Sequence, residues 1–597
     1  MPCREITTAQ MLDYFQSYSL NMDLQETRLT VSSARRLALA AVLISAFVVE
    51  TASAAALDPM EVAFRAAQLK INSTATEELS ESAILNGRFG RSLKDLIARR
   101  REIETRLEAI RHRLRTRFVP SAADDHAAAE IRARLFLAEK ETSEQLALVS
   151  DALDRASPTA MRLMRPDALT VTEARALLAP DEALVLISVN ADDTQAFAMT
   201  RQTFEWARSP VGEAEIRADV QALRRSLTGS ATIRGRAVPI EPEAEDISAF
   251  DAAAAFRLFQ HSLQPVWAVI QGYRRLIVVR SGPLRAIPMS ILVTGPAAPS
   301  PGLVRLANTN FLIDQASIAE LPTLSSLRLM HCRDDARAPD VATGCATSES
   351  VPHRRLAALS LLGIGAPEIG PSAATRVRGG PGRPAVPGAD TALLMALPPL
   401  PGARDELSAM ASILPAGGHS HTLIGAQATE AQLRGDAAHW LQTASVVVFS
   451  THALLGQEPP VRRIGEPGLV LTPPDTAVSD AANDGYLAAS EIAELSLSAR
   501  LVVLSACNTA GSASETVTDG VGVLSQAFFA AGAGALVISH WAVEDRSASD
   551  LIVRVLHGVA RGADGPEALR SAILAMRGEG RFVEPRQWGP FSYVGVR

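Results

Sequence analysis

Two short apolar runs end on side chains that can do covalent chemistry. Residues 499–509 read ARLVVLSACNT, so this run stops at Cys507. Residues 444–452 read ASVVVFSTH, and this run stops at His452. A thiolate is the nucleophile of cysteine catalysis, and a nearby histidine can remove the thiol proton and later protonate the leaving group. The two side chains would form a nucleophile and its base if the fold brings both ends together.

Both runs have the pattern of strands buried on two faces, because they are short, rich in Val and Leu, and do not alternate with polar residues. Reacting groups of parallel α/β sheets lie beyond the carboxyl ends of the strands. Cys507 follows His452 by 55 residues, which leaves room for one crossover and an insertion. We therefore predict Cys507 as nucleophile and His452 as general base, with the backbone N–H groups of Ala453 and Cys507 as oxyanion donors.

The main alternative is a structural cysteine. Free cysteine is among the most buried residue types, and a single one at a strand end is usually structural. His540, which follows the apolar run 535–539, is a rival base with its own structural interpretation. A thiol transferase or an α/β hydrolase is less well supported, because no Gly-x-Ser-x-Gly elbow, Walker loop or dinucleotide fingerprint occurs at a strand–helix junction.

The elements that must position these side chains alternate between strands and helices from about residue 179 onward. Expected strands are 183–189, 195–200, 204–208, 275–280, 313–321, 359–365, 421–424, 445–450, 468–472, 501–505, 535–539 and 591–596. Expected helices are 211–227, 250–271, 404–414, 429–439, 486–495, 519–531, 544–560 and 565–577. Such alternation predicts an α/β fold with a mostly parallel sheet and helices on both faces.

The region before this sheet has helical periodicity. Two amphipathic segments flank a break at residues 120–125 and predict an antiparallel, coiled-coil-like hairpin. The hairpin region is either an arm that binds a regulatory partner or a helical layer that packs on the following domain.

Residues 35–54 have the layout of a secretory signal peptide. A basic pair precedes thirteen apolar residues at 37–49, and Ala52-Ser53-Ala54 supplies a small-residue cleavage site. The apolar run is too short for a bilayer, which needs about 20 residues. We therefore expect a periplasmic or secreted protein without a membrane span after signal removal, in which Cys332 and Cys345 could pair. The alternative is an Ala-rich helix of a cytoplasmic protein.

Composition excludes several other classes. The chain has 597 residues, a net charge of −7 and four cysteines. This length exceeds one core, and the ordinary apolar and charged fractions argue against wholesale disorder. No basic stripe indicates nucleic-acid binding, and no Cys/His spacing indicates zinc.

Residues from about 181 to 597 resemble the CHAT domain, a bacterial and eukaryotic relative of caspases and separases. The motifs that carry the resemblance occur in order: RSGPLRAIP at 280–288, LLGIG at 361–365, LPPLPGARDE at 397–406, GAQAT at 425–429, FSTHA at 449–453, SACNT at 505–509, HWAVED at 540–545 and WGPF at 588–591. Each motif is weak alone, but this many in order make the resemblance specific.

The resemblance implies a caspase-like α/β/α sandwich with a mostly parallel sheet in two similar halves, preceded by the helical hairpin region. The implied divisions are an N-terminal segment 1–54, a helical region 55–178, a first CHAT half 179–345 and a second half 346–597 that carries the dyad.

By position, His452 matches the family's general base and Cys507 its nucleophile, the spacing being close to that of caspases. The implied reaction is hydrolysis of a protein or peptide substrate through a thioacyl intermediate, without metal or organic cofactor. Regulation by a protein partner at 55–178 is expected. The alternative function is a catalytically silent scaffold.

Two positions depart from the pattern of the relatives. Ala453 stands where many of them have Gly, which narrows the expected oxyanion pocket. Ser505 stands where several basic-specific relatives have an acidic residue, which argues against a Lys/Arg cleavage preference. Ser505, Asp519 and Asp545 are substrate-pocket candidates, although the two aspartates are exposed residues at the N-termini of helices and fit helix capping better.

Overall fold

We describe a computed structural model of the chain. It describes residues 58–86, single positions between 96 and 110, and then 126–156, 168–228, 250–296, 306–328, 359–370, 391–414, 418–454, 467–474, 483–505, 520–541 and 545–596. Cys507, Asp519, the signal-like segment, the expected disulfide pair and the turn of the expected hairpin lie outside the described residues.

A sheet of eleven strands organises the fold, in the order β3-β2-β1-β4-β5-β14-β13-β12-β8-β6-β7. The bounds are β1 Glu182–Val189, β2 Thr194–Met199, β3 Phe204–Ser209, β4 Arg275–Arg280, β5 Ser317–Leu321, β6 Ser360–Gly365, β7 His419–Ile424, β8 Val446–Ser450, β12 Leu501–Leu504, β13 Leu536–Ser539 and β14 Phe591–Val594. Within this sheet β1–β2, β2–β3 and β13–β14 are antiparallel, and the seven other pairs are parallel. The predicted mostly parallel α/β fold is confirmed.

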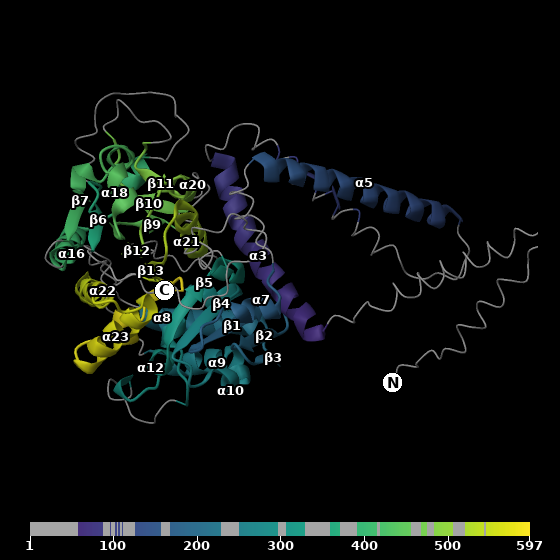
Figure 1. Cartoon of the computed structure of the whole chain (residues 1–597), viewed down its shortest axis with the longest axis horizontal. Helices are drawn as coiled ribbons and strands as arrows, with labels where there is room; N and C mark the ends of the chain where they lie inside the picture. Colours follow the sequence, from purple (N-terminus) through teal and green to yellow (C-terminus); the bar gives the residue numbers. More distant parts are fainter. Residues whose placement is uncertain are drawn as a thin grey trace, which may run out of the picture. The chain divides into compact units, whose positions relative to one another are not determined.

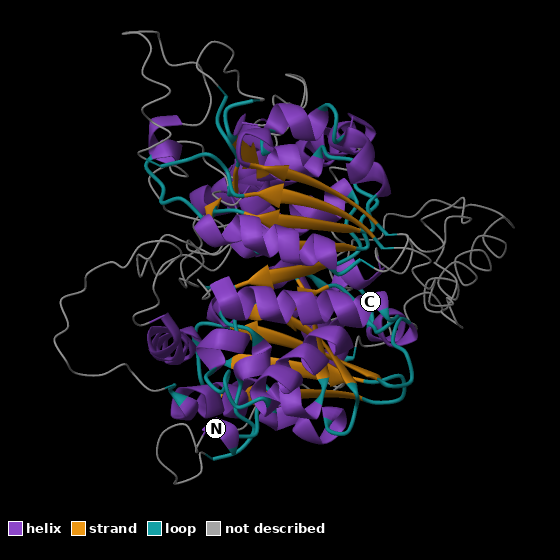
Figure 2. Ribbon diagram, turned by 90° about the vertical axis from the view of Figure 1, so that its left-hand side faces the viewer, coloured by secondary structure: helices purple, strands orange, loops and turns teal. Residues whose placement is uncertain are grey.

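Helices cover both faces of this sheet (Figure 2). Alternate residues of one strand enter different apolar clusters: Val446 and Val448 of β8 pack in one, and Val447 and Phe449 in another. The first face carries α8 Glu213–Thr228, α9 Ala252–Ser262, α16 Pro401–Ser412, α22 Asp545–Ala560 and α23 Gly565–Gly578. The second carries α7 Val171–Ala176, α17 Glu430–Arg434, α18 Ala438–Thr443, α20 Ala489–Ala493 and α21 Gly520–Ala531. Strands buried on both sides explain the continuous apolar runs in the sequence.

Short helices complete the α/β part. They are α10 Trp267–Ile270, α12 Leu312–Gln315, α15 Thr391–Met395 and α24 Pro585–Trp588, with 3₁₀ turns η2 Gln264–Val266, η3 Gly282–Ala286, η4 Met289–Ile291 and η5 Gly425–Gln427. The strand expected at 313–321 starts only at β5, because α12 occupies its first part and is capped by the Asp314 carboxylate, which accepts the Phe311 N–H at 2.7 Å. The helix expected at 429–439 is split into α17 and α18 at Gly435.

A second, three-stranded antiparallel sheet has the order β11-β10-β9. Its strands are β9 Ala453–Leu454, β10 Gly468–Val470 and β11 Tyr486–Ala488. The expected helix 486–495 is therefore wrong in its first turn, where the apolar Tyr-Leu-Ala run pairs with β10 and the helix α20 begins only at Ala489. Cross-strand pairing outweighs local helix propensity here.

The N-terminal helices have two different environments. On α3 (Pro59–Asn86), Phe64, Ala67 and Ile71 are buried in a cluster with strand residues of the first half, including Phe197. This part of α3 therefore packs as a helical layer on the strands of the first half. The helix α5 (His126–Ala156; Figure 1) starts directly after the predicted break, and its Leu137 and Leu148 are 58% and 68% exposed. Among the described helices, none is both long and apolar enough to cross a bilayer.

Candidate functional site

The candidate site lies where the parallel strands β8 and β12 end side by side. Phe449 of β8 is paired with Leu504 of β12, so Ser450 and Ser505 are the next residues along the two strands. Residues two apart on a strand point to the same face. Val446 and Val448 face the α16 side, as do Leu501 and Val503. The same alternation directs Ser450 and Ser505 toward α16.

His452 follows Ser450 by two residues and is completely buried. Its Nε2 lies 2.8 Å from the carbonyl oxygen of Pro398, in the segment that leads into α16. Because a carbonyl only accepts, Nε2 carries the proton, and the lone pair of the neutral ring is on Nδ1. This tautomer is the one in which Nδ1 can act as a base.

A buried carboxylate joins the two strand ends. Glu406 of α16 is 3% exposed. Its Oε1 accepts the Ser505 hydroxyl at 2.6 Å, and its Oε2 accepts a short hydrogen bond from the Ser450 hydroxyl. One side chain thus holds the residue two positions before His452 and the residue two positions before Cys507.

The direction of the Ala453 N–H, predicted as an oxyanion donor, follows from the pairing of β9 with β10. Val470 N–H donates to the His452 carbonyl oxygen at 2.9 Å, which makes this pair of β9 and β10 a hydrogen-bonded one. The next pair, Ala453 with Leu469, is then non-hydrogen-bonded, since the two kinds alternate along an antiparallel ladder. The Ala453 N–H therefore points away from β10, on a strand that forms the edge of its sheet.

The rival base is in an unsuitable environment. His540 directly follows β13 and is buried, with Nε2 3.0 Å from the Ser592 hydroxyl oxygen. Burial, together with the positive charges of Arg280 and Arg224, holds the pKa of His540 well below its usual value. Because a general base must become protonated during the reaction, His540 is a poor candidate for this role.

Of the other predicted site residues, the structure describes Ser505 and Asp545. Ser505 is buried and its hydroxyl is bonded to Glu406, so in this structure it ties a strand to a helix. Asp545 is the first residue of α22. Cys507 and Asp519 lie outside the described ranges. Within those ranges, no group of three or more His, Cys, Asp or Glu side chains is arranged to hold a metal ion.

Sequence reasoning assigned no role to Glu406, to Ser450 or to the Pro398 carbonyl. The available signal was a serine at the same position of two apolar strands, since a buried hydroxyl requires a hydrogen-bonding partner. The identity of that partner was not readable, because Glu406 is 44 residues from Ser450 and 99 from Ser505 in the chain.

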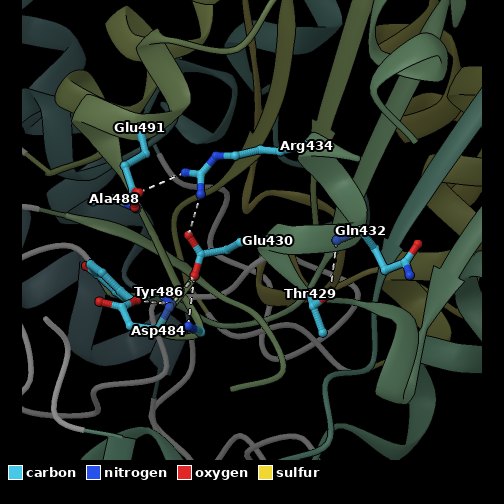
Figure 3. A network of polar contacts seen from close by, with 9 residues as sticks. Thr429, Glu430, Gln432, Arg434, Asp484, Tyr486, Ala488 and Glu491 are labelled. Carbon is cyan, nitrogen blue, oxygen red and sulfur yellow. Dashed lines mark hydrogen bonds and ion pairs between the residues drawn. The ribbon is translucent and has the colours of Figure 1, made fainter. Parts of the chain in front are cut away.

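A second buried polar cluster supports the small sheet that carries Ala453 (Figure 3). Glu430, the first residue of α17, accepts the N–H groups of Asp484 and Gly485 at 2.9 and 2.8 Å, just before β11. Arg434 contacts both Glu430 at 3.3 Å and Glu491 at 2.8 Å.

This cluster contains more carboxyl groups than cations. Burial, and then the neighbouring carboxylates Glu491 and Asp484, raise the pKa of Glu430 to about 8. Burial also raises the pKa of Glu491. The single guanidinium of Arg434 opposes these shifts without cancelling them.

Together these features define a mostly parallel α/β protein whose candidate site joins the carboxyl ends of two central strands. The CHAT domain matches residues 252–596, more than half of the chain, and the chain belongs to the CHAT domain family. The family predicted from the ordered motifs is thereby confirmed.

Two curated relatives match shorter stretches. Tetratricopeptide repeat protein 28 of Homo sapiens is 26% identical over 222 residues, 33% of this chain and 8% of that protein. Its Mus musculus counterpart is 28% identical over 109 residues, 18% of this chain and 4% of that protein. The chain therefore spans less than a tenth of the curated relatives that it matches. The Saccharomyces cerevisiae separase–securin complex aligns with 89% of this chain and 40% of that chain at 9% identity, with a TM-score of 0.37, which is too low to carry an argument.

Proposed function

We propose that this protein is a cysteine endopeptidase in which Cys507 is the nucleophile and His452 the general base. The observation that carries the proposal is the orientation of His452, whose Nε2 is held by Pro398 so that Nδ1 has the lone pair. Cys507 follows Ser505 by two residues, a distance of at most about 7 Å along an extended chain. Ser505 in turn directly follows β12, which is paired with β8, the strand that leads to His452.

The reaction would proceed in two halves. Nδ1 of His452 takes the thiol proton, and the thiolate attacks the carbonyl carbon of the scissile peptide bond. The Ala453 N–H donates to the oxyanion that forms. The C–N bond then breaks, and His452 gives its proton to the departing amine. In the second half His452 activates a water molecule, which hydrolyses the thioacyl intermediate and regenerates the thiol.

The burial of His452 supports a regulated enzyme. His452 is 0% exposed, yet in this mechanism it must protonate the departing amine of the substrate and later activate a water molecule. Access then requires the site to open, which a protein partner or the substrate itself would bring about. Leu137 and Leu148 of α5 are exposed apolar side chains that such a partner would cover. We therefore place the regulatory contact in the helical region 55–178.

The test compares wild type with Cys507→Ala on denatured casein and on a peptide library. We expect cleavage by the wild type and none by the variant, because the thiol is the only group that forms the covalent intermediate. Cys332→Ala is the matched control and should cleave like the wild type. Equal cleavage by wild type and Cys507→Ala would remove Cys507 from the mechanism.

A catalytically silent scaffold is the second candidate, favoured by the same buried histidine and exposed leucines. It requires that Cys507→Ala changes neither the proteins that co-purify with the chain nor any phenotype. Loss of a phenotype on that single substitution would exclude it.

A further inference from the structure

We propose that Glu406 is a positioning residue that sets the distance between nucleophile and base. This inference rests on the proposed function and extends it to a residue that contacts neither the substrate nor the reacting atoms. Its basis is that a single carboxylate accepts one hydroxyl from each of the two strands that lead to Cys507 and His452.

The Glu406 carboxylate binds the two chains directly after the last paired residues of β8 and β12. Paired positions of β8 and β12 extend to Phe449 and Leu504. Ser450 and Ser505 are the next residues, and here Glu406 joins the two chains from the side of α16. Two hydrogen bonds to one rigid group fix the separation of the strand ends at this point. His452 and Cys507 each follow two residues later.

The same segment also orients the base. Pro398 lies eight residues before Glu406 in the chain, and its carbonyl oxygen holds Nε2 of His452. The lead-in and second turn of α16 therefore carry both constraints, one on the ring and one on the strands. Leu407 and Met410 anchor α16 in the core beneath the sheet, so the helix is a fixed reference for both.

A buried acid at this position is costly for a purely structural purpose. Burying a carboxylate carries a desolvation penalty that apolar packing avoids, and replacing a buried polar group together with its partners by apolar groups is often neutral for stability. What apolar side chains cannot supply is a directional tie between two strands. Misplacement of a catalytic group by about 1 Å can reduce the rate by roughly 100-fold.

The test uses a variant that removes the Glu406 carboxylate together with the two hydroxyls that donate to it. Glu406→Leu combined with Ser450→Ala and Ser505→Ala deletes all three polar groups together, and we expect its thermal stability to stay close to that of the wild type. Glu406→Gln is the conservative variant, because an amide can accept from one hydroxyl and donate to the other. Ser408→Ala, on the same helix with its hydroxyl bonded to the Arg404 carbonyl oxygen, is the matched control.

Two readouts are needed, and only one depends on a known substrate. The first is the rate of Cys507 alkylation by iodoacetamide as a function of pH, with the adduct located by mass spectrometry. The second is the cleavage of casein-derived peptides, resolved into kcat and KM. Both are measured at a temperature where every variant is folded by circular dichroism.

We expect the triple variant to lose roughly 100-fold in kcat with little change in KM. Its alkylation midpoint should also move up toward the ordinary thiol value of about 8.5. Glu406→Gln should stay within about tenfold of wild-type kcat, and Ser408→Ala should match the wild type. A triple variant with wild-type kcat and a wild-type midpoint would overturn the role of Glu406. So would a Glu406→Gln variant as inactive as the triple variant, because charge and not position would then matter.

Failure of the proposed function gives a different result. If wild type and His452→Ala share an ordinary thiol midpoint, no dyad exists, and the inference falls with it. If His452→Ala raises the midpoint but the triple variant does not, the dyad stands and only the role of Glu406 is refuted.

Discussion

Gly365, the last residue of β6, lies against the backbone of Ser450. A Cβ at this position would be 2.1 Å from the Ser450 carbonyl oxygen and 2.8 Å from its carbonyl carbon. The same oxygen accepts the N–H of Ala366 at 3.0 Å, and Ala366 has a positive φ of 48°. The strand on the other side of β8 is thus in tight backbone contact at the residue that Glu406 holds. The position of Ser450 is therefore constrained by close contact with β6 and by Glu406, which also binds Ser505 after β12.

Gly365→Ala should therefore disturb the site more than an ordinary core substitution. The clash is with backbone atoms, so β6 must move away from β8, and overpacking of this kind costs about 1–3 kcal/mol. We expect a lower unfolding midpoint in urea and slower alkylation of Cys507 at neutral pH.

Gly363→Ala is the matched control on the same strand. Its added Cβ would meet the side-chain atoms Leu407 Cδ2 at 3.0 Å and Thr422 Cγ2 at 3.3 Å, whereas the Cβ at position 365 would meet backbone. Equal effects of the two substitutions would show that close approach to Ser450 is unimportant.

At the scale of elements, the sequence was sufficient where burial decides the pattern. Runs of Val and Leu predicted β8, β12 and β13 to within a residue or two, because strands buried on both faces need continuous apolar side chains. The prediction from sequence was wrong where pairing with a distant segment determines the structure. β11 is a strand because β10 pairs with it, and the residues Tyr486–Ala488 alone do not indicate this partner. The hydrogen bonds from Ser450 and Ser505 to Glu406 were not predicted for the same reason, because the partners are far apart in the sequence.

The cluster around Glu430 gives the small sheet a pH dependence. The pKa of Glu430 is raised from about 4.5 in the unfolded chain to about 8 in the fold. An acid with a raised pKa stabilises the fold fully below its unfolded pKa, and this stabilisation is lost as pH rises through the folded value. Each pH unit between the two values costs about 1.4 kcal/mol. We expect the wild type to lose stability steadily from about pH 5 to pH 8 in urea unfolding.

Glu430→Gln should flatten this pH profile, because the amide oxygen still accepts the two backbone N–H groups but cannot ionise. The variant should become more stable than the wild type above pH 8. Glu494→Gln, at the exposed end of α20, is the control and should keep the wild-type profile. A Glu430→Gln profile as steep as that of the wild type would place the titration elsewhere.

At the scale of the whole molecule, the last strand of the chain joins the two halves that the sequence suggested. β14 lies between β5 of the first half and β13 of the second, parallel to β5 and antiparallel to β13. One sheet therefore contains the strands of both predicted halves, 179–345 and 346–597. The apolar run at 591–596 predicted a strand, but not its central place, since the position of a strand in a sheet depends on pairing between distant segments.

Because β14 joins the halves, breaking its ladder should affect the whole unfolding transition. His540 N–H donates to the Pro590 carbonyl oxygen at 2.9 Å, so alternate pairs of β13 and β14 are hydrogen-bonded, and Ser592 with Ile538 is the next such pair. Ser592→Pro removes this donor from a central strand and should cost roughly 3 kcal/mol or more. Ser592→Ala is a control that removes only the hydroxyl contact with His540 and keeps the backbone N–H. His419→Pro, at the exposed first residue of the edge strand β7, should cost little. If calorimetry shows equal melting temperatures for Ser592→Pro and His419→Pro, β14 does not hold the two halves together.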